Sequence, residues 1–502
     1  MAEKMLQQLF FELIQAAIGQ RSCMPRALTM EEWKGLYDLL KKHALLGIGY
    51  VAIQKLPREQ WPPKVMILQW VAIAQQIRQR NLELSEECNE VVTILKHDGI
   101  ESVVIKGQSN LENYPEELRD FRSSGDIDLW TKLTNDSGIP IAVQQGDSVG
   151  YEYYKGVRGI IEYARLQCRL RGDKSQFKPL YYHVEYPTGK GTEVEMHYRP
   201  SFLCSPIRNM RMQRWFNDQF DICLQNKCQL GFPVLTSSVN VVYQLVHLYR
   251  HVFEGGIGLR QLMDYYFALR VWHNDVMECK DLQSQGMWSE GLGMPVMSKE
   301  GVMAVIRSFG MGKFAGAVMW VLNEVFGGAN ENDNENEKCP RRTRRGTDGG
   351  PQADIVGERE SPRIDRELKE MGPQADCFDE RQLENENGSR RTRRCTDGSP
   401  QADIVGERKL SRIDRELKEN NFVPWMICEP NEKEGKKLLE EIMKGGNFGQ
   451  YDTRDAALKK GGMVKHGLWK LKRVMRLVWS YPEEALWEPV FRVWHLGWRL
   501  IH

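Results

Sequence analysis

Two aspartates at the start of a short apolar run are the clearest chemical signal in the sequence. They are Asp126 and Asp128, and the run is Ile127–Trp130. On a β-strand, residues i and i+2 point to the same side of the sheet, so the two carboxylates would lie side by side. Mg²⁺ typically binds one or two carboxylates together with the phosphates of a substrate. The pair therefore predicts a divalent cation site, the alternative being two polar residues at a loop edge.

A second charged segment offers a third carboxylate. Residues 192–198 (TEVEMHY) alternate in polarity, which predicts a strand with Glu193, Glu195 and His197 on one face. Three carboxylates can hold two metal ions about 3.5–4 Å apart, which activate an attacking hydroxyl and stabilise a leaving oxygen. Glu193 and Glu195 are rival candidates for the third ligand. His197 either supports that ligand or packs within a hairpin.

A turn upstream has the composition of a phosphate-binding segment. A β-branched run ends at Lys106 and Gly107, and Ser109 follows ahead of an expected helix. A glycine between a strand and a helix lets the backbone approach a phosphate, and the N-terminus of a helix favours an anion. Lys106, Arg119 and Arg122 could neutralise a triphosphate. A surface position is an equally good reading of Lys106.

Together these elements resemble the uncharacterised nucleotidyltransferase family found in many bacteria, within the DNA polymerase β-like nucleotidyltransferase superfamily. The resemblance rests on KG at 106–107, NYP at 113–115, RSSGDIDL at 122–129 and VEMHY at 194–198. It extends more loosely through the N-terminal helices, the helical region around residues 247–264 and the Trp-rich C-terminus.

The resemblance implies a role for each residue of the motifs. The implied catalytic and metal-binding residues are Asp126, Asp128 and Glu195. The residues expected to bind the nucleotide are Lys106, Gly107, Ser109, Arg122 and Gly125. In this chain a Lys-Gly pair replaces the glycine–serine pair that is usual in the superfamily.

The implied activity is the transfer of a nucleoside monophosphate from an NTP to a hydroxyl acceptor. The expected cofactor is Mg²⁺ or Mn²⁺, pyrophosphate is released, and Glu195 could also take the proton of the acceptor. The sequence identifies neither the acceptor nor the base of the NTP. The alternative is a catalytically inactive protein that keeps the nucleotidyltransferase fold as a binding or regulatory module.

The elements that must position these residues form an α+β protein. Apolar spacing predicts helices near residues 6–17, 33–43, 65–84, 239–253 and 259–271. Short runs predict strands at 101–105, 127–130, 181–186 and 192–198, the last two forming a hairpin. We expect His247 and His251 to be helix-contact residues, and Arg260 to pair with Asp264 along a helix.

Changes in composition divide the chain into five parts. These are an N-terminal helical region (1–99), a small mixed-sheet nucleotidyltransferase core (100–235), a helical region (236–330), an insertion (331–420) and a C-terminal Trp/Arg-rich helical region (421–502). Residues 341–370 recur almost unchanged at 390–419, with one aromatic residue in the whole insertion. We expect the insertion to be disordered. Acidic neighbours offset its RRTRR clusters, so there is no strong nucleic-acid signal.

The overall composition is that of a globular protein. The chain has 502 residues, 41% hydrophobic and 27% charged, with a net charge of +1. Its eleven cysteines are scattered without a C-x-x-C, which argues against a disulfide framework and a zinc site. With no signal peptide or long apolar segment, we expect a cytoplasmic protein. A Trp-rich stripe within 468–502 favours a core face, with peripheral contact at the inner face of the membrane as the alternative.

Overall fold

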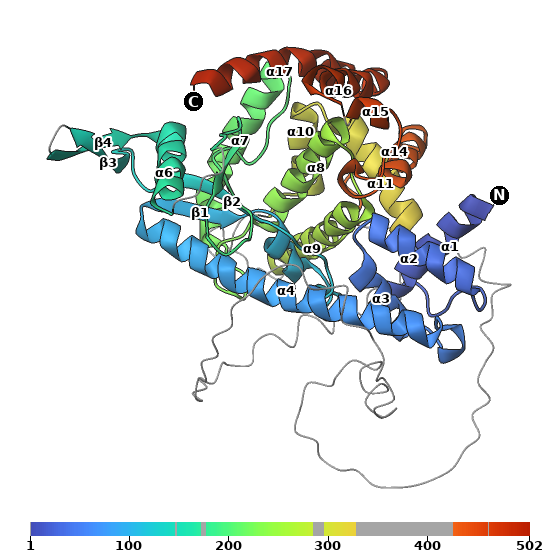
Figure 1. Cartoon of the computed structure of the whole chain (residues 1–502). Helices are drawn as coiled ribbons and strands as arrows, with labels where there is room; N and C mark the ends of the chain where they lie inside the picture. The colour runs from blue at the N-terminus through green and yellow to red at the C-terminus, as the bar shows by residue number, and fades with distance from the viewer. Residues whose placement is uncertain are drawn as a thin grey trace, which may run out of the picture. The chain divides into compact units, whose positions relative to one another are not determined.

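The computed structural model describes residues 2–145, 148–171, 177–284, 296–327, 425–459 and 461–501 (Figure 1). The expected disordered insertion at 331–420 lies outside these residues. All described residues belong to one structural unit, which is a mixed α+β protein as predicted.

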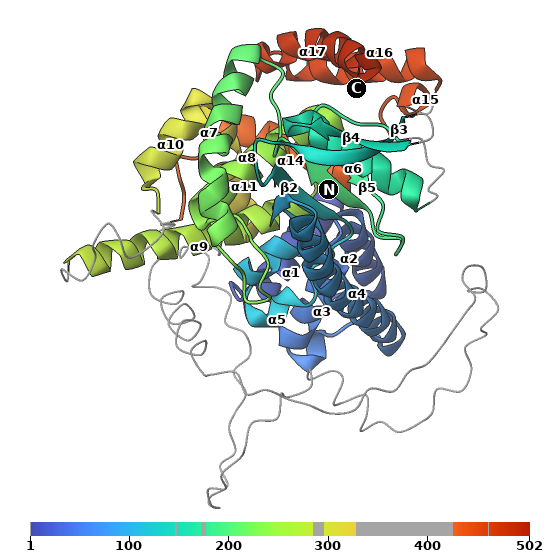
Figure 2. The same cartoon turned by 90° about the vertical axis from the view of Figure 1, so that its left-hand side faces the viewer.

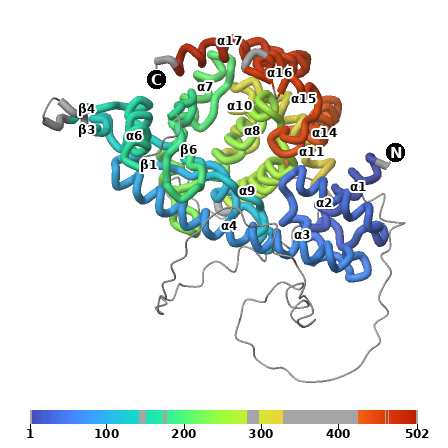
Figure 3. The backbone as a smooth tube through the Cα atoms, in the orientation of Figure 1, coloured from blue at the N-terminus to red at the C-terminus, as the bar shows by residue number. Residues whose placement is uncertain are grey.

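Four helices form the N-terminal part of this unit. They are α1 (Ala2–Ala17), α2 (Met30–Lys42), α3 (Leu46–Lys55) and α4 (Lys64–His97). Helix α2 begins at Thr29, whose side chain accepts a hydrogen bond from the backbone of Glu32 while Glu32 caps in return. Helix α4 is longer than predicted because Cys88, Val91 and Leu95 continue its apolar face beyond Leu84. Its length lets α4 contact both α3 and the sheet (Figure 3).

The central sheet has the strand order β1-β2-β6-β5. Its strands are β1 (Ile100–Val104), β2 (Ile127–Leu133), β5 (His183–Tyr186) and β6 (Val194–His197). β2 pairs antiparallel with β1 and parallel with β6, and β6 pairs antiparallel with β5. All four strands were predicted from the sequence, and the β5–β6 pairing confirms the hairpin.

The two faces of the sheet differ in chemistry. One face is apolar: side chains such as Leu129, Met196 and Val184 join a core with α4 and α6 (Gly156–Leu170). The other face carries Asp128, and farther along β2 the ring of Trp130 packs edge-on against two phenylalanines of α7 (Pro206–Gln225). The polar residues of the strands therefore meet on the face toward α7.

A second sheet was not predicted. It consists of the antiparallel pair β3 (Ile139–Gln145) and β4 (Ser148–Tyr154). The signal was present in the sequence, because Gly146-Asp147 separates two runs that contain β-branched and aromatic residues.

The remaining helices surround the sheet and α8. They are α5 (Glu116–Arg119), α8 (Ser237–Glu254), α9 (Leu259–Ser284), α10 (Lys299–Ser308), α11 (Gly312–Phe326), α14 (Glu432–Gly445), α15 (Ala456–Lys459), α16 (Met463–Leu477) and α17 (Pro482–Ile501), with 3₁₀ turns at Arg58–Gln60, Gly107–Asn113 and Asn447–Gly449. Helix α8 is buried along almost its whole length. Helices α16 and α17 lie next to each other at one edge of the unit (Figures 1 and 2).

Among the helices that the structure describes, none has the length and apolar character needed to cross a membrane.

Candidate active site

The predicted carboxylates meet on neighbouring strands. Asp128 lies directly opposite Glu195 in the parallel pairing of β2 and β6. Asp128 is fully buried, whereas Glu195 and Asp126 are half-buried. Asp126 immediately precedes β2, and its charge contributes to a raised pKa at Asp128. The structure therefore brings Asp128 and Glu195 together, with Asp126 at the entrance of the same strand.

Two histidines lie beside these carboxylates, and one of them, His197, connects Asp128 with Glu195. His197 Nε2 lies 2.9 Å from Asp128 Oδ1 and 2.9 Å from Glu195 Oε2, so His197 supports the third carboxylate. His183 Nδ1 lies 3.1 Å from the same Glu195 oxygen. The ligand atoms of His183, Glu195 and His197 all lie within 4.8 Å of one another, a spacing that could hold a metal ion. Glu193 is exposed and lies outside this cluster.

His183 is a site residue that the sequence analysis missed. It lies opposite His197 in the register of the β5–β6 hairpin. Pairing the two predicted strands outward from the loop at 187–191 would have placed His183 opposite Glu195, on the face of the sheet that carries the carboxylates; in the structure the register is shifted by two residues. Imidazole ligands suit Zn²⁺ better than Mg²⁺ or Mn²⁺, which prefer oxygen ligands.

Lys106 is directed into the cluster rather than toward the surface. Its Nζ lies 2.6 Å from Asp128 Oδ1, and its side chain is only 19% exposed. Burial on its own would lower the pKa of Lys106, but the neighbouring carboxylates, Asp128 foremost, raise it well above the usual value. Lys106 is therefore a permanent cation beside Asp128.

The electrostatics of the cluster differ from one carboxylate to the other. Burial raises the pKa of Asp128, although Lys106 acts in the opposite direction. Burial would also raise the pKa of Glu195, but the adjacent imidazoles of His183 and His197 lower it far more, so Glu195 is held ionised. Burial disfavours the charged form of His197, yet its two carboxylate partners give it a raised pKa.

The loop that leads into β2 is fixed by buried side chains. Asn81 of α4 donates from Nδ2 to the carbonyl oxygens of Asp120 (2.9 Å) and Arg122 (2.8 Å). Arg122 forms a two-point ion pair with Asp264 of α9, from Nε to Oδ1 and from Nη2 to Oδ2, each at 2.7 Å. The Tyr114 hydroxyl donates to Asp264 Oδ1 at 2.6 Å. Arg122, predicted near the phosphates, is thus already engaged by a carboxylate.

Two further bonds tie this loop to its surroundings. Arg260 of α9 donates to the carbonyl oxygen of Ser123 at 2.6 Å. Asp264 pairs with Arg122 of the loop, so the predicted pairing of Arg260 with Asp264 along the helix is wrong. The Ser124 hydroxyl donates to Gln108 Oε1 at 3.3 Å. Because Gln108 follows the Lys-Gly pair, the aspartate loop and the Lys-Gly turn form one connected structure.

The Lys-Gly turn needs its glycine. Gly107 has φ +58°, in the left-handed region, and a Cβ added there would lie 3.1 Å from the carbonyl oxygen of Asp126. The helix expected after Gly107 is a seven-residue 3₁₀ helix, Gly107–Asn113. The Ser109 hydroxyl donates back to the Lys106 carbonyl at 3.3 Å. Gly125 is exposed, and the space around its Cα is open.

His247 and His251 pack against other rings on α8, as expected for helix-contact histidines. Their ring centroids lie 4.3 Å apart, and the outer faces meet Tyr243 and Phe448. Burial lowers the pKa of His251 to about 4 and that of His247 well below its usual value. Both are therefore neutral at physiological pH.

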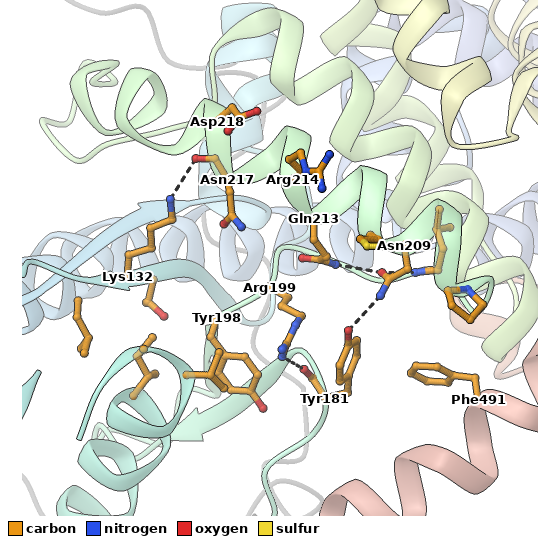
Figure 4. Close-up of a pocket in the computed structure, with 18 of the residues that line it drawn as sticks. Lys132, Tyr181, Tyr198, Arg199, Asn209, Gln213, Arg214, Asn217, Asp218 and Phe491 are labelled. Atoms are coloured by element: carbon orange, nitrogen blue, oxygen red, sulfur yellow. Dashed lines mark hydrogen bonds between the residues drawn. The ribbon is translucent and has the colours of Figure 1, made fainter. Parts of the chain in front are cut away.

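A cavity of about 1270 Å³ lies beyond the opposite end of β2 (Figure 4). Lys132, near the end of that strand, donates to the Asn217 carbonyl oxygen of α7 at 3.1 Å. Across the cavity, Asn209 donates to the Tyr181 hydroxyl at 3.0 Å, and Phe491 of α17 contributes to the wall. No predicted site residue lines this cavity. It is separate from the carboxylate cluster.

The comparisons with known proteins give one result. A family model described as an uncharacterised nucleotidyltransferase matches residues 29–286, which is more than half of the chain and includes every predicted site residue. No curated protein and no solved structure matches.

Proposed function

The chain belongs to this uncharacterised nucleotidyltransferase family, and we propose that it transfers a nucleoside monophosphate from an NTP to a hydroxyl acceptor. The acceptor oxygen bonds to the α-phosphorus, the bond from that phosphorus to the β-phosphate oxygen breaks, and pyrophosphate leaves. The observation that carries the proposal is the pairing of Asp128 with Glu195 on parallel strands, beside Asp126 and the Lys-Gly turn.

The residues present fit a divalent cation. Asp128 Oδ2 is buried, and within the described ranges no group forms a hydrogen bond with it. The other oxygen of Asp128 already binds a cation, the ammonium group of Lys106. We assign Asp126, Asp128 and Glu195 as the residues that would hold Mg²⁺ or Mn²⁺. When bound, the ion would offset phosphate charge and stabilise the leaving pyrophosphate.

The other residues of the site bind and orient the nucleotide in this proposal. Lys106 supplies a permanent cation for the triphosphate, and the backbone at Gly107 and Ser109 lets phosphates approach closely. Arg122 positions the loop through Asp264 while Gly125 leaves room for the nucleotide. Glu195 acts as a ligand rather than a base, because a carboxylate with a lowered pKa is a weak proton acceptor.

One observation favours the alternative of an inactive binding module. The ion pair between Lys106 and Asp128 neutralises a carboxylate that the reaction needs. A protein that bound nucleotides without catalysis could keep this pair permanently.

The position of the label in the NTP tests the proposal. Lysate is incubated with the protein, Mg²⁺ or Mn²⁺, and each NTP carrying ³²P at either the α- or the γ-phosphate. We expect transfer of the α label alone, reduced about 10²-fold or more in the Asp126→Ala/Asp128→Ala variant. The matched control is Asp136→Asn, an exposed aspartate just after the same strand, which should keep full activity.

Three outcomes would contradict the proposal or part of it. Transfer of the γ label would make the protein a phosphotransferase. Equal transfer by the wild type and the double variant would remove the aspartates from the reaction. A metal-dependent rise in melting temperature with NTP, without transfer to any acceptor in the lysate, would favour the inactive binding module.

A further inference from the structure

Helices α16 and α17 expose an unusual number of large apolar side chains. On α16 these are Leu468, Leu471 and Met475, which are 44–57% exposed and share one face at i, i+3 and i+7. On α17 they are Leu486, Val490 and Val493, which are 54–75% exposed at i, i+4 and i+7. Trp479, between the helices, is 87% exposed. Large apolar side chains that gather along one exposed face of a helix are typical of an interaction site.

This surface is not the Trp-rich stripe that the sequence pointed to. The rings of Phe491, Trp494 and Trp498 pack around Tyr181, with centroids 5.5, 5.0 and 6.1 Å from its ring. Phe491 and Trp498 therefore pack against the core, as the sequence analysis favoured for the stripe, whereas Trp487 and Trp494 remain 40% and 49% exposed. The exposed residues Leu486, Val490 and Val493 lie on another face of α17, within the segment 468–502 for which the sequence analysis kept peripheral membrane contact as the alternative.

The carboxylates of the two helices are kept away from the apolar face. Helix α16 contains no acidic residue. On α17, Glu484 accepts hydrogen bonds from the backbone of Cys204 and Ser205, and Glu488 is 3% exposed and pairs with Arg492. Glu483 pairs with Arg208. None of the three is left as a free negative charge.

The charged groups that remain beside the apolar face are mostly cations. Lys465 and Arg499 are exposed at the two ends of the surface. Lys472 and Arg476 are partly exposed and share a single carboxylate, Asp455. Apolar side chains flanked by a net excess of cations match an anionic lipid surface, which takes the apolar groups into its interfacial region and attracts the cations.

We propose that α16 and α17 together form a docking surface for an anionic lipid bilayer, defined by Leu468, Leu471, Met475, Leu486, Val490 and Val493. Both helices lie at the same edge of the unit in two perpendicular views (Figures 1 and 2), so they can reach one plane together. The contact is peripheral, because neither helix can span the membrane. This inference does not depend on the nucleotidyltransferase activity.

Flotation of the full-length chain with vesicles tests the proposal. One set contains phosphatidylcholine alone, and the other contains phosphatidylcholine with phosphatidylglycerol. The test variant is Leu471→Glu/Val493→Glu. The matched control is Leu68→Glu/Leu82→Glu, which places the same charges at two exposed leucines of α4. Truncation is avoided because α17 contributes the buried Glu484 and Glu488; a thermal melt confirms that each variant is folded.

We expect the wild type to float with the anionic vesicles and to bind them less at high salt. The test variant should lose about tenfold or more in affinity, and the α4 control should bind as the wild type does. Absence of wild-type binding to anionic vesicles, or an equal loss in the α4 control, would overturn the proposal. Light scattering adds a further arm: a dimer that the test variant abolishes, without vesicle binding, would assign the surface to a second copy of the chain.

Discussion

The buried ion pair between Arg122 and Asp264 should stabilise the loop that carries the aspartates. Replacing Asp264 with asparagine removes the countercharge of a guanidinium that is 3% exposed and also weakens the acceptor of the Tyr114 hydroxyl. Burial alone would lower the pKa of Arg122, and Asp264 offsets this. Because a guanidinium is not deprotonated in proteins, Arg122 would stay charged after Asp264 is replaced, without a carboxylate partner. Breaking one side of a buried pair costs about 3–5 kcal/mol. We expect a loss of this size for Asp264→Asn.

Urea denaturation followed by fluorescence measures this loss. The control is Lys436→Gln, which breaks an exposed pair with Glu432 on α14 and should cost less than about 1 kcal/mol. The double variant Arg122→Leu/Asp264→Leu removes both charges. Its loss of unfolding free energy should be smaller, by about 2 kcal/mol or more, than the summed losses of the single variants Arg122→Leu and Asp264→Leu.

Two results would refute this reasoning. An Asp264→Asn loss no larger than that of the Lys436 control would mean that the pair is not buried as described. A loss of unfolding free energy in the double variant equal to the sum of the losses in its two single variants would mean that the two charges do not interact. The double variant also tests the role of Arg122. If Arg122 only positions the loop, replacing it together with Asp264 should keep most of the affinity for NTP. If Arg122 binds a phosphate directly, the affinity for NTP should be lost.

Three further predictions concern other residues. Burial lowers the pKa of His43 to about 3, so the folded protein keeps it neutral while the unfolded chain takes up a proton below about pH 6.5. The stability from this group should therefore fall by about 2 kcal/mol between pH 7 and pH 5, and His43→Gln should remove that dependence in urea melts while the exposed His97→Gln does not. Gly107→Ala should destabilise by about 1–2 kcal/mol and reduce nucleotide transfer, because the left-handed backbone and the Asp126 carbonyl leave no room for a methyl group; unchanged transfer would contradict this. Lys106→Met should raise the dissociation constant for NTP, measured by fluorescence titration, about tenfold or more, and an unchanged constant would show that Lys106 serves Asp128 alone.

The sequence was informative where local pattern decides structure. Alternating polarity located the β5–β6 hairpin, and the D-x-D spacing located the start of β2. Helix α4 was predicted too short, although Cys88, Val91 and Leu95 continue its apolar stripe at helical spacing after Leu84 and pack in the core beside β1. The pair β3–β4 was missed although Gly146-Asp147 separates its two runs in the sequence.

The site was predicted less completely, because its contacts join residues far apart in the chain. The parallel pairing that places Glu195 opposite Asp128 is non-local, and no spacing rule reports it. The partner of Arg122 is Asp264, which lies 142 residues away on α9. The sequence therefore suggested that the guanidinium is available to bind phosphate, whereas in the structure it is already paired with a carboxylate. His183 is the exception: the predicted hairpin already implied its position.

A crystal structure with Mn²⁺ and an NTP analogue that cannot be cleaved between the α- and β-phosphates would test the central claim most directly. The anomalous signal of manganese locates the ion independently of the protein atoms. We predict manganese at about 2.0–2.3 Å from carboxylate oxygens of Asp126, Asp128 and Glu195, with the triphosphate over the Lys-Gly turn at Lys106. Manganese held by His183 and His197 without Asp126, or a nucleotide in the cavity between α7 and α17, would contradict the account.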